Sequence, residues 1–161
     1  MPFTPFHLGI GALAKAIGNR RFSFMVFGGS QVLMDIEPGV RMIQGAAVLH
    51  GPSHTLVGAV IIGFVAGVIG KPVTEFVFRI FRAKDPSVAW TASFVAAFTG
   101  TLSHIVLDAT MHFDMKPWSP ITSENGLLGS IPLGTLHLTL LLFGVIGGLF
   151  VLIRAVMDRP A

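Results

Sequence analysis

The sequence predicts an all-α protein, an integral membrane helical bundle of about five hydrophobic segments plus an interfacial amphipathic helix. Hydrophobic residues make up 52% of the 161 residues and charged residues only 12%, whereas a soluble domain carries about 25% charged residues. The mean hydropathy is +0.76, and several long stretches hold no charged side chain. This composition argues against a soluble globule, a disordered chain and a nucleic-acid-binding module. The length is that of one domain, residues 1–161.

Five apolar segments are expected to build the bundle. A membrane-spanning helix needs about 20 mainly apolar residues, and residues 126–153 form the clearest uncharged stretch. Gly-Pro and Lys-Pro pairs bound the third segment, because proline suits the first turn of a helix and ends a preceding one. The two N-terminal segments are shorter, so each is either a short or tilted span or a half-buried helix packed on the others, and we favour spans. The expected spans are residues 6–18, 22–36, 55–70, 86–110 and 126–153.

A short amphipathic helix is predicted at residues 73–83. Its apolar residues follow the three- and four-residue spacing of one helix face, and Arg79 and Arg82 lie between them. This pattern is typical of a helix that lies in the membrane interface. The apolar residues of this face are Val73, Phe76, Val77, Ile80 and Phe81.

Most Lys and Arg residues fall in alternate connections between the expected spans. Short loops rich in Lys and Arg stay on the cytoplasmic side of a membrane. The connections at 37–53 and 111–125 contain only Arg41 and Lys116 as basic residues, so we expect both connections to face outward. The basic residues expected on the cytoplasmic side are Arg20, Arg21, Lys71, Arg79, Arg82, Lys84, Arg154 and Arg159.

Histidines and carboxylates gather at the segment ends opposite the basic connections. Ionisable groups in a membrane segment are costly unless they are paired or functional. His104, Asp108 and His112 are spaced four residues apart, which places them on one stripe of a helix. His50 and His54 repeat this spacing at the start of another span. We therefore expect one polar layer near the outer interface, formed by His7, Asp35, Glu37, His50, His54, His104, Asp108, His112 and Asp114.

These side chains predict a site for a divalent metal. Imidazole and carboxylate groups in a chain without cysteine suit Zn²⁺, Mn²⁺, Fe²⁺ or Ni²⁺. The candidates outnumber the ligands that one ion needs, and a pair of ions is the arrangement used in phosphoester hydrolysis. The predicted metal ligands are His7, Asp35, His50, His54, His104, Asp108 and His112. The candidate catalytic carboxylates, which would accept a proton from water, are Asp35, Glu37 and Asp114. The isolated His137 is left outside the site.

Six short motifs carry a resemblance to a known family. MPFTPFHLGIG at residues 1–11, DIEP at 35–38, HGPSHT at 50–55 and GTLSHIVLD at 100–108 resemble, in this order, the small bacterial membrane-bound metal-dependent hydrolases. MHFDMKP at 111–117 and NGLLG at 125–129 resemble one branch of that family, which is itself similar to zinc-dependent phospholipase C.

The resemblance implies a zinc site, with manganese or iron as alternatives and one or two ions bound. The ligands it implies are His7, Asp35, His50, His54, His104 and Asp108. Many members of the wider family carry an Arg where this chain has Gly51. A role for that Arg in binding an anionic substrate therefore does not carry over.

The expected function is that of a metal-dependent hydrolase integral to the bacterial cytoplasmic membrane, with its site facing outward. The expected substrate is amphiphilic and lipid-like, and it would be cleaved at a phosphoester or similar bond. Its partner would be membrane lipid and not nucleic acid. Three alternatives stay open. A metal transporter needs polar groups that continue to the inner side, and a membrane di-iron oxidase uses more histidines, including adjacent pairs. A non-catalytic membrane protein would use the polar groups to join helices and bind no metal.

Overall fold

The computed structural model describes residues 5–158, and within that range the chain is helical with no β-strand. The first four residues of the N-terminal motif, together with Arg159, lie outside the described residues. Short 3₁₀ helices at Pro5–His7, Asn19–Arg21 and Pro52–His54 accompany the five α-helices. The α-helices are α1 (Leu8–Gly18), α2 (Phe24–Ile43), α3 (Leu56–Ile80), α4 (Trp90–Met111) and α5 (Leu133–Met157).

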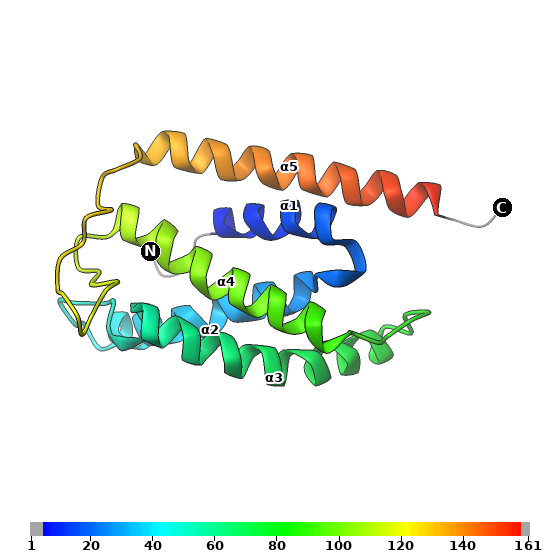
Figure 1. Ribbon diagram of the computed structural model, residues 1–161, viewed down its shortest axis with the longest axis horizontal. Helices are drawn as coiled ribbons and strands as arrows, with labels where there is room; N and C mark the ends of the chain where they lie inside the picture. Colours follow the sequence, from blue (N-terminus) through cyan, green and yellow to red (C-terminus); the bar gives the residue numbers. More distant parts are fainter. Residues whose placement is uncertain (1–4, 159–161) are drawn as a thin grey trace.

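The helices pack along one common direction with α4 in the middle. Figure 1 shows α1 beside α5 on one side of the molecule and α2 with α3 on the other, and α4 contacts α3, α2 and α1. Small residues of α4, Ala96 and Ala97, pack with Phe27 of α2 and Ala66 of α3 in a buried apolar cluster. Of the three longest apolar helices α4 is the most buried, so its side chains are shielded from lipid on several sides.

Three helices among the described residues, α3, α4 and α5, are long and apolar enough to cross a membrane. The two N-terminal segments are not confirmed as spans. Helix α1 has 11 residues and rises about 16 Å at 1.5 Å per residue, about half the thickness of a bilayer core. Helix α2 has 20 residues but carries Asp35, Glu37 and Arg41 within its second half.

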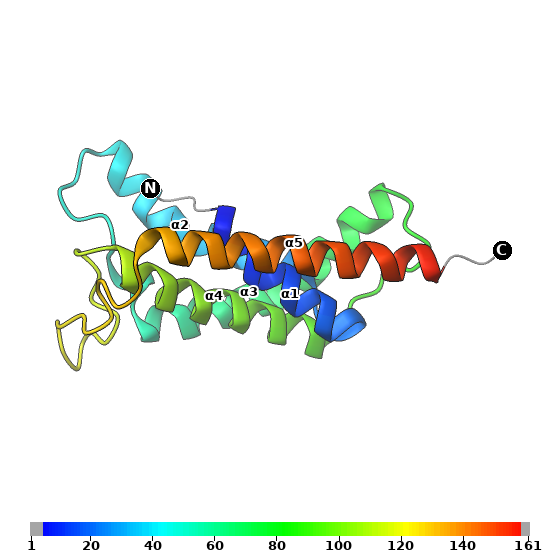
Figure 2. The ribbon, with the colours of Figure 1, turned by 90° about the horizontal axis from the view of Figure 1, so that it is seen from above.

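The prediction of a separate interfacial helix at residues 73–83 is wrong, because α3 continues through Pro72 to Ile80. Proline removes one backbone hydrogen bond and bends a helix without always ending it, and Figure 2 shows the last turns of α3 turned aside from the bundle. Lys71 pairs with Glu75 and donates to the Val88 carbonyl, and Glu75 accepts from the Val88 N–H. These bonds fix the last turns of α3 to the segment before α4.

The last span also begins later than expected. Residues 126–132 form turns, and α5 starts at Leu133 after Pro132. The stretch is uncharged, but Gly129 has a positive φ of 70°, a conformation that glycine adopts without strain. The absence of charged side chains therefore indicates apolar character in residues 126–132, but these residues do not form a helix.

Glycines bring α1 unusually close to α5. A methyl group at Gly9 would overlap the carbonyl oxygen of Leu140, and one at Gly147 would lie 2.6 Å from the carbonyl oxygen of Ala12. Gly148, by contrast, faces open space. Close approach of this kind lets helix backbones pack without large side chains between them. It holds the short α1 in place, with His7 immediately before its first residue.

The basic connections share one end of the molecule, as expected. In Figure 1 the turn between α1 and α2, the connection between α3 and α4, and the C-terminal end of α5 all lie at the same end of the bundle. The connections at 44–55 and 112–132 lie at the opposite end. Which end faces the cytoplasm stays a prediction.

Candidate metal centre

Four histidine side chains surround the carboxylate of Asp108. The Nε2 atoms of His104 and His54 lie 3.2 Å and 3.5 Å from its Oδ2, and that of His50 lies 3.9 Å from the same oxygen. The Nε2 atom of His7 lies 3.4 Å from Oδ1. All five residues are buried. We call these residues, together with Asp35, the Asp108 cluster.

Except for His50, which lies in the irregular segment before Pro52, each side chain of the cluster comes from a helix end or a helix interior. His104 and Asp108 lie one turn apart on the buried face of α4. His7 ends the 3₁₀ helix before α1, and His54 ends the 3₁₀ helix before α3. The latter helix starts at Pro52, which suits the first helical position. Side chains from separate segments therefore converge on Asp108; the position of this cluster near an outer membrane interface stays a prediction.

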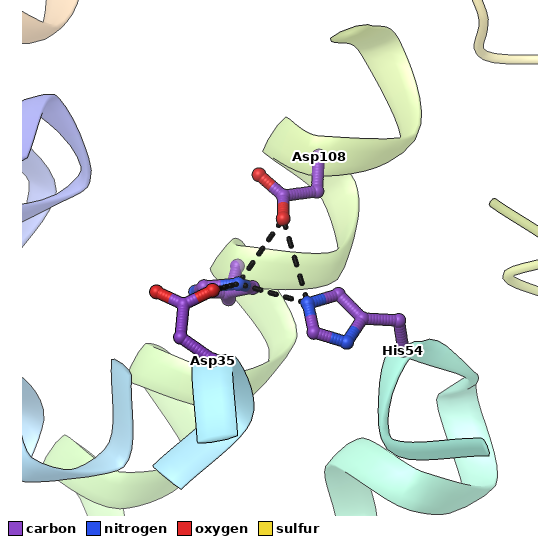
Figure 3. Close-up of side chains that lie close together, drawn as sticks. Asp35, His54 and Asp108 are labelled. Carbon is purple, nitrogen blue, oxygen red and sulfur yellow. Dashed lines mark hydrogen bonds and ion pairs between the residues drawn. The ribbon is translucent and has the colours of Figure 1, made fainter. Parts of the chain in front are cut away.

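Asp35 on α2 completes a four-residue group. Its Oδ1 lies 3.4 Å from the Nε2 of His104, and the Nε2 atoms of His104 and His54 are 3.2 Å apart. Figure 3 shows Asp35, His54 and Asp108 pointing toward one another from three different elements. One ligand atom from each of Asp35, His54, His104 and Asp108 lies within 4.8 Å of the others, so this buried group could hold a metal ion.

A second group shares Asp108 with the first. His50, Asp108 and His112 also offer ligand atoms within 4.8 Å of one another. His112 caps the C-terminus of α4 and is only partly buried. A small cavity of about 120 Å³ borders His50 and His112, which is room for a few water molecules. The second group therefore lies on the more solvent-accessible side.

Hydrogen bonds at the other ring nitrogen orient His104. Its Nδ1 lies 2.6 Å from Oε1 of the buried Gln31, whose Nε2 donates to the Gly100 carbonyl at 3.0 Å. Because the Gln31 amide donates to Gly100, its oxygen accepts from His104 Nδ1. A neutral ring with its proton on Nδ1 would present the lone pair of Nε2 to the cluster, which is how metal-binding histidines are commonly held.

Asp114 holds His50 in the same way. Its Oδ1 lies 2.8 Å from His50 Nδ1, and its Oδ2 accepts from the N–H groups of Leu49 at 2.8 Å and His50 at 3.2 Å. Burial opposes ionisation of Asp114, but these hydrogen bonds outweigh it and lower its pKa to about 2. An ionised Asp114 keeps the proton of His50 on Nδ1, so Nε2 is free to face Asp108.

Glu37 lies outside the converging atoms. Its Oε2 accepts from the Ser53 N–H at 2.8 Å, and its Oε1 accepts from the Arg41 guanidinium, with Nη2 at 2.8 Å. Ser53 in turn places its hydroxyl 2.9 Å from Nδ1 of His54. Glu37 and Asp114, both predicted as catalytic carboxylates, are thus engaged in positioning the segment that carries His50 and His54. Asp35 is the one predicted catalytic carboxylate inside the cluster.

The donor set fits a divalent cation. Bonds of about 2.0–2.1 Å in a tetrahedral site place neighbouring ligand atoms about 3.3 Å apart, and four contacts of the first group measure 3.2–3.5 Å. Within the described part of the chain, three buried side-chain atoms have no hydrogen-bond partner: Thr101 Oγ1, His7 Nε2 and Asp108 Oδ1. The last two face each other at 3.4 Å, although His7 belongs to neither metal-binding group. Buried polar atoms are normally paired, and a bound cation would supply the missing partner.

Two further histidine and glutamine side chains, His137 and Gln31, lie outside the predicted set of site residues. His137, expected outside the site, stacks on Phe6 with ring centroids 4.4 Å apart and belongs to neither metal-binding group. Gln31 was not predicted as a site residue. The available signal was its position four residues before Asp35, which places an uncharged polar side chain on the same face of α2.

The fold and the site together define a helical protein that has three helices long and apolar enough to cross a membrane and a buried His and Asp group that could hold a metal ion. No family model, no curated protein and no solved structure matches the chain. The family that the motifs resemble therefore stays a prediction, and the function is argued from the site itself.

Proposed function

We propose that this protein is a membrane-bound metal-dependent hydrolase that cleaves a phosphoester or similar bond in a lipid-like substrate. The observation that carries the proposal is the convergence of four histidine Nε2 atoms on Asp108. Buried ionisable groups are costly in an apolar protein unless they are paired or functional, and all five of these side chains are buried.

The arrangement favours zinc, bound as one or two ions. A nitrogen and oxygen donor set at tetrahedral spacing suits Zn²⁺, and Mn²⁺ or Fe²⁺ are the alternatives. Asp108 belongs to both groups, so it would be the shared ligand if two ions bind. When bound, such ions lower the pKa of a coordinated water and polarise a phosphoryl oxygen.

The chain's own residues then have distinct tasks. Asp35 belongs to the first group and also lines a cavity that opens between α1 and α2. We assign it the acceptance of a proton from the attacking water. Asp114 and Glu37 hold the segment of His50 and His54 in place through the bonds described above. The apolar surroundings exclude bulk water, which strengthens charge interactions within the site.

The proposal is tested by hydrolysis assays on purified, metal-loaded protein in detergent. The substrates are a phospholipid, an isoprenoid phosphate and a model phosphodiester. We expect cleavage of at least one substrate, a loss of at least about 100-fold in Asp108→Asn, and retention in His137→Ala, the matched histidine outside the cluster. The proposal is overturned if metal-loaded protein cleaves none of them and ligand substitutions leave the lipid profile of the cells unchanged.

A further inference from the structure

An apolar groove leads from the surface of the bundle to the Asp108 cluster. It lies between α1 and α2, with a volume of about 410 Å³. His7, Gln31 and Asp35 lie among its lining residues, so the groove reaches the cluster. Its remaining walls are glycine or apolar: Pro5, Leu8, Phe24, Met25, Gly28, Gly29 and Val32.

The groove has the form needed to accept a hydrocarbon chain. A Cβ atom on Gly29 would meet no atom within 4 Å, and one on Gly28 would only touch Leu8 at 3.9 Å. Met25 and Val32 are 45% and 48% exposed, so the groove opens on the apolar outer surface of the helices. An alkyl or prenyl chain from the bilayer would gain apolar contacts there without passing through water.

A second pocket reaches the cluster from another side. It has a volume of about 440 Å³, and His50, Asp114, Arg41 and Lys116 line it. Lys116 is exposed, and the Arg41 side chain is 36% exposed although it pairs with Glu37. The negative charge of Asp114 is already engaged by His50 and two backbone N–H groups. Among the described residues Lys116 has no ion-pair partner, so it can attract an anionic group, whereas the charge of Arg41 in the same pocket is engaged by Glu37.

Gly51 makes room for one of these cations. A Cβ atom at Gly51 would lie 2.6 Å from Nη2 of Arg41 and would overlap the Glu37 carboxylate. A side chain at this position would displace the guanidinium from the pocket. The absence of a side chain at Gly51 therefore allows Arg41 to lie in the pocket that His50 also lines.

The groove and the pocket approach Asp108 from two sides, each through one histidine that contacts this carboxylate. His7, which lines the groove, faces Oδ1 of Asp108, and His50, which lines the pocket, faces Oδ2. We infer that the substrate is a single-chain amphiphile with a phosphate-containing head group, its chain in the groove and its head group beside Arg41 and Lys116. This inference rests on the proposed function, and it adds the shape and charge of the substrate.

Photo-crosslinking tests the inference by binding alone. The probe is hexadecyl phosphate with a diazirine at the chain end, added to zinc-loaded protein in phosphatidylcholine nanodiscs. We expect labelling within residues 22–36 and displacement by unlabelled hexadecyl phosphate but not by hexadecanol. Gly29→Phe should lower labelling at least about fivefold, equivalent to about 1 kcal/mol. Gly148→Phe, at a glycine that faces open space on α5, is the matched control and should leave labelling unchanged.

Two more variants, Val32→Trp and Lys116→Ala, test the groove and the pocket separately. Val32→Trp places a larger side chain at a half-exposed position of the groove lining and should also reduce labelling, while metal content reports that each variant is folded. Lys116→Ala should weaken displacement by hexadecyl phosphate at least about threefold. Labelling outside the groove, labelling unchanged in both groove variants, or displacement by hexadecanol would each overturn the inference.

The same variants separate this inference from the proposed function. Labelling in the groove with no hydrolysis of any substrate supports the binding mode and removes the hydrolase proposal. Hydrolysis that Gly29→Phe and Val32→Trp leave unchanged for both butyl and hexadecyl esters keeps the hydrolase proposal and removes the groove.

Discussion

In His104 and His50, the hydrogen bond at Nδ1 determines whether the Nε2 atom is free to bind a metal ion. In His104 and His50 the Nδ1 atom is held by Gln31 and Asp114, at 2.6 Å and 2.8 Å. These bonds place a lone pair of Nε2 on each ring toward Asp108. Such outer partners raise the affinity of a metal site because they fix the ring and its tautomer before the ion arrives.

Replacement of Gln31 tests this role. Gln31→Leu removes the acceptor for His104 and should lower metal affinity by about 10- to 100-fold, measured by competition with a chromogenic chelator. Gln44→Leu is the matched control, because Gln44 is exposed after the end of α2. Unchanged affinity in Gln31→Leu would show that the bond to His104 does not serve the metal.

Removal of His112 tests whether two groups act separately. His112 belongs only to the second group, so His112→Ala should halve the metal content of a protein that binds two ions, while Asp108→Asn should remove both. Elemental analysis of the purified variants measures this. A wild type with one ion per chain, unchanged in His112→Ala, would restrict the centre to the first group.

Among single residues, the sequence predicted most of those that meet at Asp108, but it placed Glu37 among them, missed Gln31 and did not show which task each residue has. The four-residue spacing of His104 and Asp108 was sufficient to place both on one face of α4. The positioning roles of Gln31 and Glu37 depend on hydrogen bonds between residues distant in sequence, such as the bond from Ser53 N–H to Glu37. Spacing along one helix carries no information about such bonds.

Helix α1 depends on its contact with α5. It is too short to span a bilayer core by itself, and it presents His7 to Asp108 through the residue just before its start. The backbone of Ala12 leaves no space for a side chain at position 147. The packing of α1 on α5 therefore supports the side chain of His7, which contacts Asp108.

The pair Gly147 and Gly148 gives a matched test of this contact. Gly147→Leu should destabilise the protein by about 1–3 kcal/mol, the usual cost of overpacking, and should lower metal affinity through His7. Gly148→Leu should do neither, since nothing lies within 4 Å of a Cβ there. Unfolding in detergent and metal titration measure both effects. Equal stability of the two variants would contradict the glycine-mediated contact.

The sequence predicted where helices form better than it predicted where they begin and end. All five expected segments contain an α-helix, because apolar stretches of that length are rarely anything else in a membrane protein. Pro72 was taken as a helix end, yet the bonds of Lys71 and Glu75 to Val88 hold the following turns in place. These contacts with the segment before α4 are tertiary, so local pattern did not reveal them.

The whole molecule has two unlike ends. Basic connections occupy one end and the Asp108 cluster lies toward the other, so the charge bias predicts that the connection at 112–132 faces outward. The chain has no cysteine, which makes single-cysteine labelling clean. Ser123→Cys should react with a membrane-impermeant maleimide in intact cells, whereas Ala83→Cys should react only after permeabilisation. The reverse pattern would invert the orientation.

Metal content tests the central claim most directly. Wild-type protein, purified in detergent, incubated with Zn²⁺ and desalted, should retain one or two ions per chain by elemental analysis. Asp108→Asn should retain none, because both groups lose their shared ligand, and His137→Ala should match the wild type. A folded wild type without metal, or an Asp108→Asn variant with full metal content, would contradict a metal centre built around Asp108.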